Sequence, residues 1–106
     1  MSHLEASVAP GETGPLVVLA GEADLTSLAQ LDEVITAQVS AGVPELTVDV
    51  SGLRFMDSAS ARTLLLAARA LRERGGRVVL LGPRPAVTRI LAILGVVHMF
   101  VIRGQA

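Results

Sequence analysis

Apolar residues recur along the chain with two different periods, which predict strands separated by helices. Short apolar runs predict about five strands, at residues 4–8, 16–20, 45–50, 77–81 and 99–102. Apolar residues three or four positions apart predict three helices, from Asp24 to Gly42, from Ser58 to about Arg74, and from Pro83–Pro85 to Gly95. The resulting β-β-α-β-α-β-α-β order predicts a single α/β domain over residues 1–106, with a central, largely parallel sheet covered by helices.

Local signals mark the expected boundaries and core faces. Asp24 is the N-cap candidate of the first helix, with Thr26 as its competitor. A turn at Ser51–Gly52 is expected to separate the third strand from a short extended link at 53–56. The residues that we expect to form the core stripes of the first and third helices are Leu28, Leu31, Ile35, Val39, Val87, Ile90, Leu91 and Leu94.

The composition excludes several kinds of chemistry. The chain has no cysteine, which excludes disulfides and thiolate metal sites. All nine basic residues are arginine, which excludes mechanisms that need a lysine, such as a Walker-type phosphate loop or a Schiff base. A net charge of −1 and the absence of Tyr and Trp disfavour nucleic-acid binding. We expect no cofactor. We expect no membrane insertion, because no apolar run is long enough to span a membrane. We expect a cytoplasmic location, because no signal peptide is visible.

The most informative segment is 49–66, which places Asp57 and Ser58 on a strand-to-helix turn. In open α/β sheets, functional groups gather beyond the carboxyl ends of the strands. Either residue can be explained as an ordinary N-cap. A cap and a modification site are compatible, because a helix N-terminus tolerates the negative charge that a phosphate adds.

Ser58 begins one stripe of the expected second helix. At about 100° per residue, this stripe contains Ser58, Arg62, Leu65, Arg69 and Arg72. The opposite face, which we expect in the core, contains Ala61, Leu64, Ala68 and Leu71. Leu66 lies beside the polar stripe and is either a contact for another protein or an ordinary exposed leucine. Arg62, one turn after Ser58, can pair with a phosphate there or with an acidic partner, or it can simply be solvated.

Several motifs together carry a family resemblance. The runs Gly21–Asp24, Val48–Gly52 and Phe55–Ser58 resemble those of the STAS domains of bacterial anti-anti-sigma factors. The chain is also similar to this family in its Gly-Gly-Arg-Val strand, its proline-flanked third helix and its closing segment 95–100. The resemblance extends from about Leu4 to Ile102 and implies the STAS fold, with a central mixed sheet.

The resemblance also implies a switch. In this family the unmodified protein binds an anti-sigma factor that is also a serine kinase, and thereby frees a sigma factor. Phosphorylation of the serine after the aspartate breaks that complex, and a phosphatase restores it. Carried onto this sequence, Ser58 is the phosphoacceptor, and the protein itself is not an enzyme; a homodimer is compatible with this role. The partner-binding residues expected on this basis are Asp24, Asp57, Ser58, Ala59, Arg62, Leu65, Leu66 and Arg69.

The motif departs from the family pattern at two positions. Ser60 stands where the family usually has glycine, which makes Ser60 a rival phosphosite. Arg62 stands where a small residue is common. Both changes add bulk or charge to the face on which a partner would dock.

Three other functions compete with this interpretation. A serine hydrolase needs a base beside its serine, but Ser58 lacks a Gly-x-Ser-x-Gly context, and His98, expected to be structural, is the only histidine of the expected folded body. A phospho-aspartate receiver domain would use a lysine, which the chain lacks. A STAS scaffold or regulatory subunit of a stress-signalling or transporter complex keeps the fold without a sigma-factor role.

Overall fold

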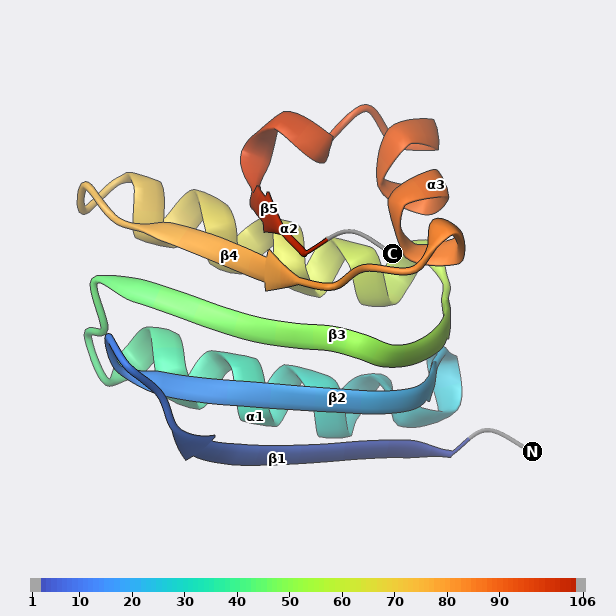
Figure 1. Ribbon diagram of the computed structural model, residues 1–106, viewed down its shortest axis with the longest axis horizontal. Helices are drawn as coiled ribbons and strands as arrows, with labels where there is room; N and C mark the ends of the chain where they lie inside the picture. Colours follow the sequence, from blue (N-terminus) through green and yellow to red (C-terminus); the bar gives the residue numbers. More distant parts are fainter. Residues whose placement is uncertain (1–2, 105–106) are drawn as a thin grey trace.

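The computed structural model describes residues 3–104, and its elements follow the expected β-β-α-β-α-β-α-β order (Figure 1). The strands are β1 (Leu4–Pro10), β2 (Pro15–Ala23), β3 (Glu45–Met56), β4 (Arg77–Leu81) and β5 (Val101–Arg103). The α-helices are α1 (Leu28–Ser40), α2 (Ser58–Arg72) and α3 (Pro85–Ile93). Two short 3-10 helices, η1 and η2, precede α1 and β5; they are Leu25–Ser27 and Val97–Met99.

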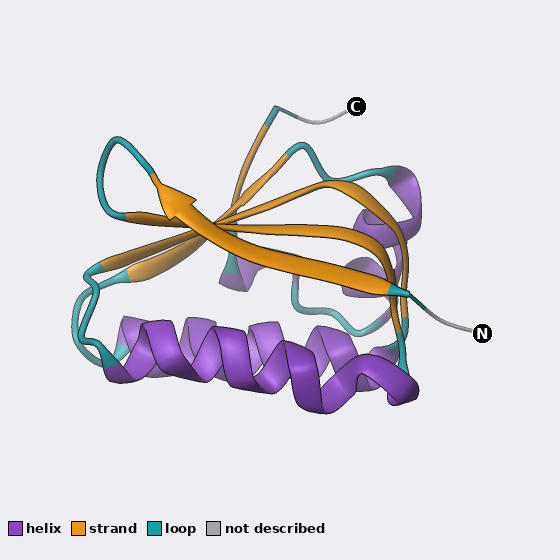
Figure 2. Ribbon diagram, turned by 90° about the horizontal axis from the view of Figure 1, so that it is seen from below, coloured by secondary structure: helices purple, strands orange, loops and turns teal. Residues whose placement is uncertain are grey.

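The strands form one mixed sheet in which spatial order equals chain order, β1-β2-β3-β4-β5. β1 is antiparallel to β2, whereas β2, β3, β4 and β5 run parallel. Figure 2 shows α1 and α2 packed side by side against one face of this sheet. The carboxyl ends of β2, β3 and β4 lie on the same side of the molecule, and α1, α2 and α3 begin there (Figure 1).

The core lies between the sheet and the two long helices. Alternate side chains of β2 and β3 are fully buried there: Val17, Leu19, Leu46, Val48 and Val50. The face of α2 that we expected in the core is also fully buried, which confirms the helical stripe: Ala61, Leu64, Ala68 and Leu71. The opposite stripe of α2, which begins at Ser58, is thereby left free of the sheet.

β3 is longer than expected, because the expected turn at Ser51–Gly52 is not formed. The strand continues to Met56 and includes the segment that we expected to be a separate link. One extra residue relative to β2 lies between Asp49 and Gly52, which is the pattern of a β-bulge. The Oδ1 atom of Asp49 accepts hydrogen bonds from the backbone N–H (2.9 Å) and hydroxyl (2.6 Å) of Ser51 and supports this bulge. The sequence signal for a turn therefore marked a bulge within one strand.

A second bulge changes which side chains of β3 face the core. Gly21 pairs with Leu53 and Glu22 pairs with Phe55, so Arg54 is the extra residue. Because one extra residue reverses the alternation of a strand, Phe55 is exposed and Met56 is buried. An exposed aromatic side chain therefore lies two residues before Asp57.

Element boundaries differ from the expected ones near the C-terminus. α2 ends at Arg72, two residues early, and β5 begins at Val101, because η2 occupies the residues before it. Leu94, which we expected in the core, is 41% exposed. It is the C-cap residue of α3 and directly precedes Gly95, which takes a left-handed φ of 71° and ends the helix.

The β1–β2 hairpin is tied to the amino ends of β3 and β4. The Thr13 hydroxyl donates to Glu45 Oε2 (3.1 Å), and Glu45 Oε1 accepts from Arg77 Nε (2.6 Å). The hydrogen bond from Arg77 holds the pKa of Glu45 below its ordinary value, against the opposing effect of partial burial. These contacts lie at the amino ends of β3 and β4, whereas Ser58 lies beyond the carboxyl end of β3.

Candidate functional site

The carboxyl ends of β2 and β3 bring two aspartates to neighbouring positions. The strand register pairs Ala23 with Met56, so Asp24 and Asp57, the next residues, leave the sheet side by side. The backbone N–H of Asp57 also donates to the carbonyl oxygen of Ala23 (3.0 Å). The two loops that the sequence singled out are therefore joined directly by a backbone hydrogen bond.

Asp24 holds the first of these loops in shape. It is the N-cap of η1: its Oδ1 accepts from the backbone N–H (2.9 Å) and the hydroxyl (2.6 Å) of Thr26. Its own backbone N–H donates to Ser27 Oγ (3.1 Å), which completes a capping box. Thr26, the competing cap, is thus a donor to Asp24. The half-buried Asp24 carboxylate has a structural task in this loop.

Asp57, and not Ser58, is the N-cap of α2. The Asp57 carboxylate accepts a hydrogen bond from the backbone N–H of Ser60 (2.8 Å). Ser58 is the first residue of the helix and is exposed. Within residues 3–104, its hydroxyl forms no hydrogen bond. The capping role therefore leaves the Ser58 hydroxyl available for other chemistry.

A groove of about 440 Å³ separates α2 from the segment that follows α3, and we call it the α2–α3 groove. One wall is formed by α2, and the other by Leu94 and Val96. The α2 wall contains Ser58, Ala59, Ala61, Arg62, Leu65 and Arg69. The stripe expected from helical spacing thus lines a concave surface, with Ser58 at its N-terminal end.

The charges in the α2–α3 groove have one sign. Arg62 and Arg69 line it, and none of the residues that line it is acidic. Both arginines are exposed, and neither forms an ion pair with a residue of the described chain. Arg72, the last member of the stripe, instead donates from Nη1 to the Met99 sulfur (3.0 Å). The groove therefore offers two free guanidinium groups next to apolar side chains.

Leu66 lies outside the α2–α3 groove. It is 46% exposed and lines a smaller cavity of about 160 Å³ between α1 and α2. In the same cavity, the Thr63 hydroxyl donates to Asp32 Oδ1 (2.5 Å). The structure thus separates Leu66 from the other expected docking residues of α2.

Exposed apolar residues near the site were missed by the sequence analysis. Leu25, directly after Asp24, is 72% exposed, and Phe55, two residues before Asp57, is 47% exposed. Leu94 and Val96 supply the second wall of the groove. Leu25 was detectable as an apolar residue in a polar loop, but the outward position of Phe55 depends on a bulge that local periodicity does not reveal.

Ser60 is buried. It has no exposed surface, and its hydroxyl has no hydrogen-bond partner within the described chain, although its backbone N–H is bonded to Asp57. A kinase could reach this hydroxyl only if the helix start opened. The burial argues against Ser60 as the rival phosphosite, and it leaves a polar group that costs stability.

We predict that Ser60→Ala stabilises the protein by about 1 kcal/mol, because it removes a buried hydroxyl that forms no hydrogen bond and keeps the helix-forming Cβ. Ser58→Ala, the control two residues away, should change stability by less than about 0.5 kcal/mol, because the Ser58 hydroxyl is exposed. Urea denaturation followed by circular dichroism measures both. A destabilised Ser60→Ala variant would reveal a hydrogen bond of this hydroxyl.

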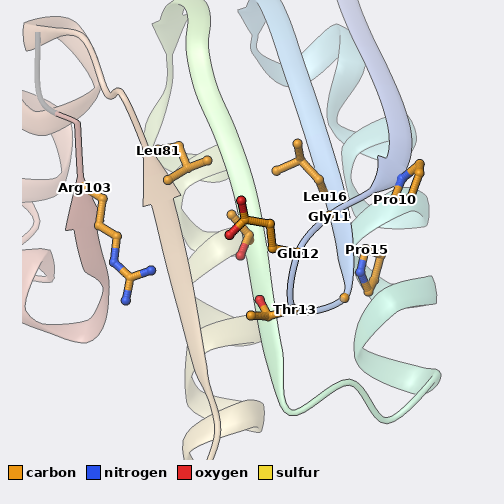
Figure 3. A pocket seen from close by; sticks show the side chains of 10 residues that line it. Pro10, Gly11, Glu12, Thr13, Pro15, Leu16, Leu81 and Arg103 are labelled. Carbon is orange, nitrogen blue, oxygen red and sulfur yellow. The ribbon is translucent and has the colours of Figure 1, made fainter.

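A larger cavity, of about 610 Å³, lies under the β1–β2 hairpin (Figure 3). Hairpin residues line it together with Thr47, Leu81 and Arg103. Figure 3 shows Glu12 extending over β3, while Arg103 lies beyond β4. This cavity contains none of the residues singled out in the sequence and lies away from the carboxyl ends of β2 and β3, so we do not assign the switch to it.

Three further observations concern other classes of site. No three His, Cys, Asp or Glu side chains among residues 3–104 are arranged so that they could hold a metal ion. His98 is exposed in η2 and forms no hydrogen bond through its side chain within that range. None of the described helices is both long and apolar enough to cross a membrane.

Comparison with known proteins identifies a family with this arrangement. A family model described as "Mlab, STAS domain" matches residues 7–103. BtrV of Bordetella bronchiseptica, which is provisionally named an anti-sigma factor antagonist, is 31% identical over 85 residues. The matched region covers 80% of this chain and 73% of BtrV.

Solved structures match over nearly the whole chain. An anti-sigma factor antagonist from Mycobacterium paratuberculosis has a TM-score of 0.85 and 23% identity, and the match covers 95% of this chain and 86% of that chain. SpoIIAA in its unphosphorylated form has a TM-score of 0.74 and 25% identity, with coverage of 94% and 87%. Bacillus SpoIIAA in its phosphorylated form has a TM-score of 0.68 and 23% identity, with coverage of 96% and 90%. The expected fold, with its five-stranded mixed sheet and three α-helices, is confirmed.

Proposed function

This chain belongs to the STAS domain family, and from that premise we propose that it is an anti-sigma factor antagonist controlled by phosphorylation of Ser58. The unmodified chain binds an anti-sigma factor that has serine kinase activity, and a sigma factor is released. A phosphate on Ser58 ends this binding until a phosphatase removes it. The names of BtrV and SpoIIAA support the antagonist role, and the two forms of SpoIIAA support control by phosphorylation.

The proposal depends mainly on one observation, the exposed position of Ser58 at the start of a helix that Asp57 caps. Because Asp57 satisfies the free N–H at this helix end, a change at Ser58 does not remove the cap. A phosphate on Ser58 would add about −1.5 to −2 charges at a helix N-terminus, where negative charge is favourable. The fold can therefore accept the modification.

The same position makes binding sensitive to the modification. Ser58 lines the α2–α3 groove, and Leu25 and Phe55 provide exposed apolar surface on the neighbouring loop and strand. A partner that covers this region would bury Ser58. A doubly charged phosphate inside such an interface costs several kcal/mol unless the partner compensates for it. The switch thus needs no change in the fold of this chain.

We predict that the purified chain, incubated with ATP and the kinase anti-sigma factor encoded nearest to its own gene, gains one phosphate on Ser58. Intact-mass analysis counts the phosphates, and fragment mapping locates them. Ser58→Ala should gain none, whereas Ser7→Ala, which changes an exposed serine of β1, should be modified like the wild type. A phosphate on Ser60 or Thr63, or none at all, would contradict the assignment.

A further inference from the structure

We propose that the α2–α3 groove binds an acidic, partly apolar segment of the partner, and that this segment and a phosphate on Ser58 compete for Arg62. This inference rests on the proposed function, because it specifies the partner chemistry and the means of release for the same site. It concerns a residue at which this chain departs from the usual family pattern. Arg62 makes the switch depend on an attraction within the chain as well as on repulsion from the partner.

The chemistry of the groove selects an acidic segment. Arg62 and Arg69 place two positive charges in it, and no acidic residue lines it, although the whole chain has a net charge of −1. The charge of the groove is thus opposite to that of the chain. Carboxylates are the side chains that complement guanidinium groups, and they also direct the encounter between the two proteins.

The apolar part of the groove indicates that the segment also carries hydrophobic side chains. Leu65 and Val96 are half-buried, and Leu94 is 41% exposed, yet all three line the same cavity. Apolar side chains of a bound segment would remove this surface from water. Nucleic acid fits less well, since these walls offer no aromatic stacking surface. A protein segment with both carboxylate and apolar side chains satisfies both walls.

Arg62 is the arginine that a phosphate on Ser58 can reach. Residues four apart on a helix lie on the same face, and both Ser58 and Arg62 line the groove. Four residues advance a helix by about 6 Å, whereas the eleven residues to Arg69 advance it by about 16 Å. A phosphate on Ser58 can therefore pair with Arg62 in a bidentate manner, while Arg69 stays out of reach.

Competition for Arg62 follows from this geometry. Without the phosphate, Arg62 has no ion-pair partner in the described part of the chain and is available to a partner carboxylate. With the phosphate, the guanidinium pairs within the helix, and the N-terminal end of the groove becomes negative. The acidic segment then loses one favourable contact and meets a like charge. Arg69 alone cannot hold it.

The first test needs no partner. The whole chain is prepared with a phosphate on Ser58 by incorporating phosphoserine during translation, and phosphorus NMR follows the second ionisation of the phosphate near pH 6. Because a neighbouring cation favours the doubly charged phosphate, the pKa should lie about half a pH unit lower in the wild type than in Arg62→Gln. Arg69→Gln and Arg89→Gln, which changes an exposed arginine outside the groove, should titrate like the wild type. Equal titration of Arg62→Gln and wild type would overturn the inference.

The second test measures binding of the unphosphorylated chain to the anti-sigma factor. Arg62→Gln and Arg69→Gln should each weaken binding about tenfold and reduce its dependence on salt, whereas Arg89→Gln should not. Unchanged affinity and salt dependence of both groove variants would overturn the acidic partner segment and leave the antagonist function standing. If the wild type binds no anti-sigma factor at all, the proposed function fails, and the partner half of the inference fails with it. The phosphorus titration then still decides the pairing with Arg62.

Discussion

Gly76→Ala is expected to lower the free energy of unfolding by about 3 kcal/mol, whereas Gly75→Ala, one residue earlier, should lower it by about 1 kcal/mol. The two glycines follow the end of α2 one after the other, and the sequence alone does not distinguish their roles. The structure distinguishes them by different physical requirements. Gly75 supplies a backbone conformation, and Gly76 supplies space.

The contacts of the two positions explain the difference. Gly75 has a left-handed φ of 76°, but an added Cβ would meet nothing within 4 Å. A Cβ on Gly76 would lie 2.1 Å from the carbonyl oxygen of Pro44, which is backbone and cannot rotate away. That same oxygen accepts the Arg77 N–H (3.2 Å), and the Gly76 N–H donates to Leu71 (2.7 Å). Relief of the clash would therefore move the starts of β3 and β4 together with the end of α2.

Urea denaturation followed by far-ultraviolet circular dichroism is the suitable measurement, because the chain has no Trp or Tyr to report by fluorescence. Gly42→Ala is a further control, with a left-handed φ of 79° and open space around the added Cβ. It should behave like Gly75→Ala. If Gly76→Ala were no less stable than these two variants, the close approach of Pro44 would be wrong.

Local spacing was enough to predict much of the fold. The order of elements and the buried face of α2 depend on the spacing of apolar residues within short segments, which can be seen in the sequence. The alternation of β3 is interrupted twice, between Asp49 and Gly52 and again after Leu53, because each bulge is defined by pairing with β2, a segment about thirty residues earlier. For the same reason, the sequence could not show that Phe55, two residues after the buried Leu53, points outward.

In the candidate site, too, the residues of a single helix were predicted together, whereas residues that another element contributes were not. Ser58, Arg62, Leu65 and Arg69 share a helical stripe and were expected together, because one helix determines their relation. The second wall of the groove was missed, because Leu94 is the C-cap residue of α3 and Val96 reaches the groove only after the chain has turned at Gly95. Similarly, residue type could not decide whether Asp57 or Ser58 is the N-cap of α2, because both types are favoured there. The bond from Ser60 to Asp57 decides it.

Ser58→Asp is expected to weaken binding to the anti-sigma factor about 100-fold while the fold survives. The substitution places a permanent negative charge on the first residue of α2, at the N-terminal end of the α2–α3 groove. Negative charge at a helix N-terminus is favourable by about 0.3 to 1 kcal/mol, so the melting temperature should not fall. An acidic partner segment, by contrast, meets a like charge beside Arg62.

Calorimetric titration of the wild type, Ser58→Ala, Ser58→Asp and Ser7→Asp measures their affinities for the anti-sigma factor. The comparison separates the effect of a charge at Ser58 from the effect of net charge and from the effect of losing the hydroxyl. The wild type and Ser58→Ala should bind alike, because the exposed hydroxyl forms no hydrogen bond within residues 3–104. Ser7→Asp adds the same charge on β1, outside the groove, and should bind nearly as well as the wild type. Equal weakening by Ser58→Asp and Ser7→Asp would attribute the effect to net charge. Full affinity of Ser58→Asp would mean that the partner does not cover Ser58, and the groove would then lose its place in the switch.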